Sequence, residues 1–531
     1  MEGVRWDLTS YFPSFGGEEM VRFRDALLAD AENILREATD LDTLDIENFE
    51  EWEAMLLHYE DFEARQVHYA SYIECICSAN SDSKEYAAEE ATAAKVAAAR
   101  AKIEIEIQAG LKGITSKVFN AFSSRPAMSG ARLRLERLRA IADHTMTTGQ
   151  ERLAADLAVD GLHSWSRLYE NMTGRMSFRM NWPDGKVERL PISSYYGLVA
   201  SVDRQVGRAA FEGALTAWEE REDVLAAALN AISGFTTTLW KYRHYRDVLE
   251  VPLHQTGIKR KTLDAMYRAI RANIELPRAI FREKAKFMGR KGIEWFEREA
   301  PLPLRESGLL SWEQGSRMVH DSFLRVYPEL GMFYGQMLDR RWIESEARAG
   351  KRPGAFQTAS YITGEPRVFM VYNGTLTDVA TLAHEVGHAW HDHLLRDTRV
   401  FARRYPTTMG ETASVFAEHL FAEGVYRDPS VPDLQKLMML DSDLCGAALF
   451  LLDITVRFDF ERQFYEERKK GEVGAHQLRE MMASTQRQVM GSALLEGGEH
   501  PMLWATKVHF FLTDRAFYNF PYTFGFLLSL A

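Results

Sequence analysis

Residues 377–395 read TDVATLAHEVGHAWHDHLL, and the interpretation of the whole chain begins from this stretch. Apolar residues recur at positions 379, 382, 383, 386 and 390, which is the spacing of one buried face of an α-helix. Thr377 is expected to cap the helix, with Asp378 in its positively polarised first turn. The stretch therefore predicts an amphipathic helix that packs one face into a core.

Two histidines lie one turn apart on this helix. His384 and His388 are four residues apart, about 6 Å along the axis, and project from the same face. Two imidazoles placed in this way can converge on one tetrahedral ion. Glu385 lies beside them, where it can hold a water that the metal polarises and act as general base. This HExxH pattern, expected by chance in only about a few such chains in a hundred, predicts a metal site of the metallopeptidase type.

A third ligand must come from elsewhere in the chain. The longer pattern HExxHxxGxxH would need glycine at position 391 and histidine at 394, but the sequence has His391 and Leu394. Downstream, GETASVFAE opens another helical pattern, with Glu411 and Glu418 seven residues apart on one face. A carboxylate from a neighbouring helix would complete a His₂Glu site and leave the fourth position for water. Glu411 is therefore the leading candidate for the third ligand.

Two nearby residues keep alternative interpretations. His391 falls on the same helix face as the two histidines of the motif, and lies either beside the metal and substrate or in solvent. Glu418 either orients a ligand histidine or is an ordinary surface carboxylate.

The segment HEVGHAWH, followed 23 residues after His388 by ETASVFAE, resembles the M3 peptidases, and specifically their oligoendopeptidase F branch. Three further stretches agree with this resemblance: WDL at 6–8, GAF with RVFMVYNGTLTDVATLAHE leading into the motif, and HFFLTDRAFYNFPYTFG near the end. The resemblance extends over almost the whole chain.

The resemblance implies one zinc ion held by His384, His388 and Glu411, with Glu385 as base and proton shuttle. It implies an endopeptidase that hydrolyses internal bonds of short oligopeptides.

The resemblance also implies that His509, Tyr518 and Tyr522 line the substrate side of the site. In the family, a histidine and tyrosines of this C-terminal segment hydrogen-bond the peptide and the tetrahedral oxyanion, a role that suits donors aimed at developing charge. The alternative is that both tyrosines are aromatic core residues.

Periodicity elsewhere predicts a mainly α fold with a small β element beside the motif helix. A helical pattern runs from about residue 18 to 170. Residues 177–181 and 186–192 flank the turn Pro183-Asp184-Gly185 and predict a β-hairpin. Residues 355–362 and 367–372 predict a second hairpin just ahead of the motif helix.

We expect an N-terminal helical domain over 1–185 and a catalytic domain over 186–531. The family resemblance implies a two-lobed helical zincin, of the gluzincin type, with the site at the bottom of a deep channel that admits oligopeptides. It also implies that strand 367–372 offers its edge to an extended substrate. The apolar ending FGFLLSLA lacks a stop signal, so truncation at the C-terminus is expected.

The composition agrees with these expectations. The chain has 531 residues, a formal net charge of −12 and 46% hydrophobic residues, which is typical of a globular protein and argues against nucleic-acid binding. Its three cysteines cannot form a disulfide framework. The sequence has no signal-peptide pattern and no membrane-spanning run, so we expect a cytoplasmic protein without a membrane partner.

Two alternatives to the endopeptidase remain at this point. One is a zinc exopeptidase, either a dipeptidyl peptidase or a carboxypeptidase, on a similar helical scaffold. The other is a catalytically silent peptide-binding protein, whose signature would be the loss of a ligand or of the base.

Overall fold

A computed structural model of the chain describes residues 3–303, 309–352 and 354–531. The fold is mainly helical, as the sequence predicts, with a few short strands. The chain divides into two compact units, which we call the first unit (within 1–152 and 308–429) and the second unit (within 153–307 and 430–529). The expected domain boundary at residue 185 and the deep channel stay predictions.

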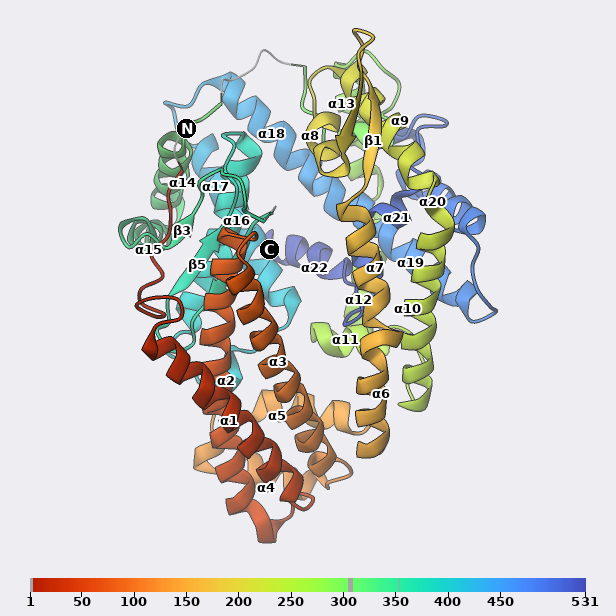
Figure 1. Cartoon of the computed structure of the whole chain (residues 1–531). Helices are drawn as coiled ribbons and strands as arrows, with labels where there is room; N and C mark the ends of the chain where they lie inside the picture. The colour runs from red at the N-terminus through yellow and green to blue at the C-terminus, as the bar shows by residue number, and fades with distance from the viewer. Residues whose placement is uncertain (1–2, 304–308, 353) are drawn as a thin grey trace. The chain divides into compact units, whose positions relative to one another are not determined.

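The N-terminal part of the first unit is a set of long helices. α1 (Glu18–Asp40), α2 (Phe49–Ala79) and α3 (Lys84–Leu111) pack side by side (Figure 1), and α4 (Ser116–Ser123) and α5 (Arg132–Ala142) extend the same core. A Cβ added at Gly110 would lie 2.2 Å from the Trp52 ring, so glycine is required where α3 ends against this indole.

The remaining elements of the first unit surround the motif helix. They are α14 (Trp312–Val326), α15 (Pro328–Asp339), β3 (Ile343–Glu344), β4 (Phe356–Ala359), β5 (Pro366–Phe369), α16 (Leu376–Leu395) and α17 (Thr407–Tyr426). β4 and β5 form the antiparallel hairpin that the sequence predicts, and its Phe356 pairs with Phe369. α16 packs against both strands and most extensively against α17.

The position of β5 corrects one expectation from the sequence. β5 lies between β3 and β4 in a three-stranded sheet, with β3 parallel to it. The amides of Met370 and Tyr372 donate to the carbonyls of Glu344 and Ser345, at 2.9 and 3.1 Å. The expectation that strand 367–372 offers a free edge is therefore wrong, because a two-residue strand, too short to show a period of two, already pairs with it.

The second unit contains the other helices and the first predicted hairpin. Its elements are most of α6 (Thr148–Gly161), α7 (His163–Gly174), β1 (Ser177–Asn181), β2 (Val187–Pro191), α8 (Tyr195–Val199), α9 (Arg204–Glu219), α10 (Glu222–Tyr242), α11 (Glu250–Thr256), α12 (Arg260–Ala272), α13 (Glu275–Phe287), α18 (Asp433–Ala448), α19 (Ile454–Arg468), α20 (Ala475–Met490), α21 (Leu503–Thr506) and α22 (Phe520–Ser529). β1 and β2 pair antiparallel from Ser177 opposite Pro191 to Asn181 opposite Val187, which confirms this hairpin.

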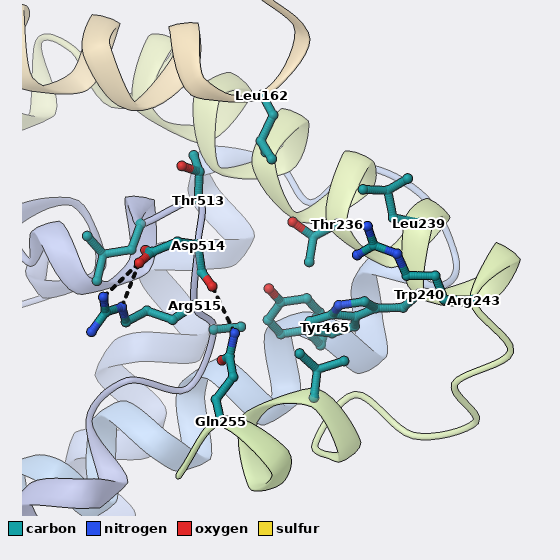
Figure 2. A pocket seen from close by; sticks show the side chains of 13 residues that line it. Leu162, Thr236, Leu239, Trp240, Arg243, Gln255, Tyr465, Thr513, Asp514 and Arg515 are labelled. Carbon is teal, nitrogen blue, oxygen red and sulfur yellow. Dashed lines mark hydrogen bonds and ion pairs between the residues drawn. The ribbon is translucent and has the colours of Figure 1, made fainter. Parts of the chain in front are cut away.

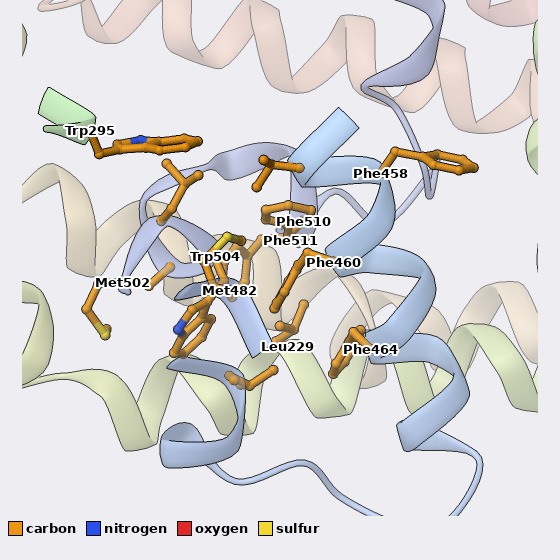
Figure 3. Packing of buried hydrophobic residues seen from close by; sticks show 14 of the residues in the cluster. Leu229, Trp295, Phe458, Phe460, Phe464, Met482, Met502, Trp504, Phe510 and Phe511 are labelled. Atoms are coloured by element: carbon orange, nitrogen blue, oxygen red, sulfur yellow. The ribbon is translucent and has the colours of Figure 1, made fainter. Parts of the chain in front are cut away.

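The core of the second unit is rich in aromatic side chains. Phe460 and Phe464 of α19 pack with Trp504, Phe510 and Phe511 of the C-terminal segment (Figure 3). All five are at most 6% exposed. This packing fixes the backbone on either side of the residues that the sequence assigns to substrate contact.

No helix in the described part of the chain combines the length and the hydropathy of a membrane span. Cys75, Cys77 and Cys445 are buried and form no disulfide, as expected.

Candidate metal centre

The motif helix α16 begins with a reciprocal cap. The Thr375 hydroxyl accepts from the amide of Asp378 at 3.1 Å, and the Asp378 carboxylate accepts from the amide of Thr375 at 3.0 Å. The expectation that Thr377 caps the helix is therefore wrong by two residues. Thr375 is favoured because the residue three positions on is an acid that can reach back, which completes a capping box.

The structure brings His384, His388 and Glu411 together. Glu411 Oε2 lies 3.7 Å from His384 Nε2 and 4.0 Å from His388 Nε2. One ligand atom from each of the three residues lies within 4.8 Å of the others. Ligand atoms about 2 Å from a tetrahedral ion lie about 3.3 Å apart, so the donor set suits one such ion, and its atoms would draw slightly closer together on binding.

Gly387 makes this convergence possible. It lies between the two histidines on α16, and a Cβ added there would lie 2.7 Å from both the Ala413 carbonyl oxygen and the Ala417 Cβ of α17. These distances are too short for any other residue, so the backbones of α16 and α17 approach each other closely here. Glu411, two residues before Ala413, is thereby carried to the face that bears both histidines.

Glu418 orients one of the candidate ligands. Its Oε1 lies 2.5 Å from His384 Nδ1, on the opposite side of the ring from the atom that faces Glu411. A proton on Nδ1 leaves the Nε2 lone pair free for a metal, as in carboxylate–histidine–metal arrangements. Burial lowers the pKa of His384, but the hydrogen bond and charge of Glu418 outweigh it and raise the pKa to about 9, so a metal that binds at Nε2 displaces a proton from that atom. Of the two interpretations of Glu418, the geometry favours orientation of a ligand.

His388 is held neutral. Burial, together with the charges on His384 and His391, lowers the pKa of His388 to about 3. A neutral imidazole keeps the lone pair that a metal requires.

Glu385 is buried beside these residues, with only 6% of its surface exposed. Burial raises the pKa of its carboxyl group to about 7, against the opposing charge of His384 and with a further contribution from Glu411. Within the described residues, Glu385 Oε2 has no hydrogen-bond partner. A buried carboxylate oxygen without a partner is costly, so this position fits an acceptor that holds a water or a substrate group.

His391 lies outside the ligand group. Its ring stacks on Tyr405, with centroids 4.3 Å apart and planes at 13°. The Tyr405 hydroxyl donates to Asp392 at 3.0 Å, and Gln357 of β4 donates to the other oxygen of that carboxylate, also at 3.0 Å. Tyr405, Asp392 and Gln357 carried no sequence signal, because their relation to α16 depends on the fold.

His509, Tyr518 and Tyr522 form one aromatic cluster in the second unit. The His509 ring centroid lies 5.2 Å from that of Tyr518 and 6.2 Å from that of Tyr522, and the two tyrosine rings are 5.7 Å apart. All three side chains are only partly buried, whereas their neighbours Phe517 and Phe520 are core residues. The alternative that these tyrosines are core residues is therefore not supported.

The protonation of His509 follows from its partner. His509 Nδ1 lies 2.8 Å from Asn519 Oδ1, and Arg457 donates to the same oxygen at 3.2 Å. Because a carboxamide oxygen only accepts, Nδ1 carries the proton. Burial, against the hydrogen bond of Asn519, lowers the pKa of His509 to about 4, so the neutral ring presents Nε2 as an acceptor.

The segment before Tyr518 is held at two points. Asp514 accepts from Arg515 through its carboxylate and from Gln255 through its carbonyl at 3.0 Å, at the edge of a cavity also lined by Tyr465 (Figure 2). The amide of Phe517, whose φ is +54°, donates to the buried Glu461 at 2.7 Å. A left-handed phenylalanine is strained, so this hydrogen bond is what fixes the direction of the next residue.

Two family models match the chain. Residues 313–530 match Peptidase family M3, and residues 111–178 match Oligopeptidase F. The first match contains the HEVGH stretch, Glu411 and the segment with His509. The chain belongs to peptidase family M3.

Within that family the chain is similar to oligoendopeptidase F. The Oligoendopeptidase F homolog of Lactococcus lactis subsp. lactis (strain IL1403) is 24% identical over 397 residues, which are 74% of this chain and 65% of that protein. The chain thus spans slightly less than two thirds of the length of this curated relative.

Solved structures share the fold. A putative peptidase from Chlamydophila abortus has a TM-score of 0.77 at 19% identity, covering 98% of this chain and 86% of that one. Oligoendopeptidase-F from Enterococcus faecium has a TM-score of 0.66 at 16% identity, covering 96% and 86%.

Replacing Gly387 with alanine should disrupt the metal centre by separating α16 from α17. We expect Gly387→Ala to lower the free energy of unfolding by about 1–3 kcal/mol, the usual cost of overpacking, and to weaken zinc binding because Glu411 moves away. Thermal unfolding and a competitive zinc titration measure the two effects. Gly446→Ala on α18 is the control, since a Cβ there meets nothing within 4 Å. Wild-type zinc affinity in Gly387→Ala would contradict the argument.

Replacing Glu418 tests its orienting role. Glu418→Gln removes the charge that fixes the His384 tautomer and should weaken zinc binding by about 10–100-fold. The affinity is measured by competition with a chromophoric chelator. Glu423→Gln on the same helix, where Glu423 forms an accessible ion pair with Arg427, should bind zinc like the wild type. Equal affinities of the two variants would show that Glu418 is a surface carboxylate.

Proposed function

We propose that the chain is a zinc-dependent endopeptidase that hydrolyses internal peptide bonds of short oligopeptides. The observation that carries the proposal is the convergence of His384, His388 and Glu411 beside the unpartnered Glu385 carboxylate. Membership of family M3 and the similarity to oligoendopeptidase F support the same chemistry and the same class of substrate.

Zinc suits a site of two imidazoles and one carboxylate, which leaves a fourth position open. When bound there, the ion supplies Lewis acidity, which lowers the pKa of a water towards about 7 and polarises a peptide carbonyl. His384 is held for this role by Glu418, and His388 by its neutrality.

Glu385 is assigned the proton transfers. A carboxyl group whose burial raises its pKa to about 7 can take a proton from water and return it to the leaving amine at neutral pH. Its unpartnered oxygen provides the acceptor that this exchange requires.

The aromatic cluster is assigned to substrate contact, with different roles for its members. Because neutral His509 presents Nε2 as an acceptor, it is suited to accept from a backbone amide of the peptide. Tyrosine hydroxyls can donate, so the oxyanion is assigned to Tyr518 or Tyr522.

Oligopeptides are the proposed partners, with no nucleic acid or membrane. The net charge of −12 disfavours nucleic acid. Three cysteines without a disulfide fit a reducing compartment, which supports a cytoplasmic location.

The test is hydrolysis of quenched peptides of increasing length by the zinc-loaded protein. Glu385→Gln should lower kcat by at least about 10²–10⁴-fold while the zinc content stays at one ion per chain, because only the proton acceptor is lost. A chelator should abolish wild-type turnover, and added zinc should restore it.

Glu423→Gln serves as the matched control for loss of one carboxylate and should keep wild-type rates. Product masses distinguish the enzyme classes, since internal cuts support the endopeptidase and terminal trimming supports an exopeptidase. Wild-type turnover by Glu385→Gln would refute the mechanism, and peptide binding without cleavage would favour a silent binder.

A further inference from the structure

We propose that the second unit contains a binding site for the carboxylate of a peptide, formed around Lys507 and Arg298. The proposal rests on the proposed peptidase function. The site is a cavity of about 50 Å³, large enough for a small polar group. Its polar and aromatic lining includes Tyr196, Arg298, Glu299, His500, Thr506 and Lys507.

Lys507 is a half-buried cation without a hydrogen-bonding partner. Its ammonium group lies over the Tyr196 ring, 5.6 Å from the centroid. Among the described residues it makes no hydrogen bond and no ion pair within 4 Å. The cation–π contact satisfies none of the three N–H donors of the ammonium group, so these donors are available to an anion in the cavity. An anion in the cavity would supply the missing acceptor.

The charges around the cavity leave a positive excess. Asp453 is shared by two guanidinium groups, Arg298 at 2.7 Å and Arg457 at 2.7 and 3.0 Å. The Arg298 group also lies 3.8 Å from the centroid of the Trp295 ring, and Figure 3 shows this ring at the edge of the aromatic core. Burial disfavours the charged form of Asp453, but the charges of Arg457 and Arg298 hold its pKa well below the usual range. One carboxylate therefore faces two arginines and Lys507.

The other titratable groups at the cavity do not remove this excess. Glu299 lies 3.9 Å from Arg298 with 58% of its side chain exposed, so solvent screens it. Burial, with the charges of Lys507 and Arg298, lowers the pKa of His500 to about 3, so His500 is neutral. Burial and Arg457 lower the pKa of Lys507 to about 8, which leaves the ammonium mostly protonated at pH 7.

The cavity is connected to the residues assigned to the peptide. Lys507 lies two residues before His509, in the same turn of chain. Arg457 shares Asp453 with Arg298 of the cavity lining and also donates to Asn519, which accepts from His509. A carboxylate of a bound peptide, either its C-terminus or an acidic side chain, has the charge and size that this cavity accepts.

The test compares two quenched peptides of identical sequence, one ending in a free carboxylate and one in an amide. The wild type should show a KM about tenfold lower for the free acid, which corresponds to about 1.4 kcal/mol. Lys507→Met keeps the length of the side chain and removes its charge, so it should raise the KM for the free acid and abolish the difference. Lys507→Arg should preserve the difference. So should Lys470→Met, which removes an exposed charge paired with Glu467.

A second pair of amidated peptides, ending in aspartate or asparagine, identifies the source of the carboxylate. Discrimination within either pair that depends on Lys507 supports the site. Equal KM values within both pairs for the wild type would overturn it while leaving the peptidase function intact. If Lys507→Met does not fold, Lys507→Gln replaces it in the same comparison, and discrimination that persists in the variant would overturn the site.

Binding separates this inference from the function on which it rests. If no peptide is cleaved, the proposed function fails, and the same peptides are titrated calorimetrically into Glu385→Gln. About tenfold tighter binding of the free acid would still support the carboxylate site, and equal binding would overturn it.

Discussion

The close approach of α17 to α16 at Gly387 is the constraint on which the candidate metal centre depends. A Cβ at this position would meet backbone and side-chain atoms of α17 at 2.7 Å. α17 is held in the same way on another side, because a Cβ at Gly424 would lie 2.5 Å from Ser322 of α14. With the helix fixed at these two points, Glu411 reaches the histidines and Glu418 reaches His384 from positions seven residues apart, about two turns, on one helix. Side chains on packed helices keep the geometry that a metal site needs.

In the first unit, close packing of helices positions the candidate metal ligands. In the second unit, buried charged and polar side chains position His509. Asp453, Arg457 and Asn519 form a chain of hydrogen bonds that ends on His509. Glu461 holds the strained Phe517 just before Tyr518. These hydrogen bonds hold the backbone and the ring of the segment that is proposed to contact the substrate. Among the described residues, Lys507 makes no ion pair within 4 Å.

The sequence predicted the parts of this account that depend on local pattern. The period of the motif helix, the spacing of His384 and His388, and the two hairpin turns are local, and the structure has them. Glu411 was predicted because the motif requires a third ligand. The two-residue strand β3 could not be predicted from the sequence. It pairs with the edge of β5 that was expected to bind the substrate. The sequence predicted Thr377 as the capping residue of α16. The cap is Thr375, because Asp378 lies three residues after it and completes a capping box. The proposed role of Lys507 could not be predicted from the sequence, because Tyr196 and Arg298, which lie near it in the fold, are distant from it in the sequence.

The central claim is that His384, His388 and Glu411 hold one zinc ion. Crystals of the zinc-loaded protein, with diffraction data collected on both sides of the zinc absorption edge, test it most directly. The account predicts one anomalous peak per chain at the site, within about 2.0–2.2 Å of the two histidine Nε2 atoms and of a Glu411 oxygen. An absent peak at full zinc occupancy in solution, or a peak whose ligands exclude Glu411, would contradict it.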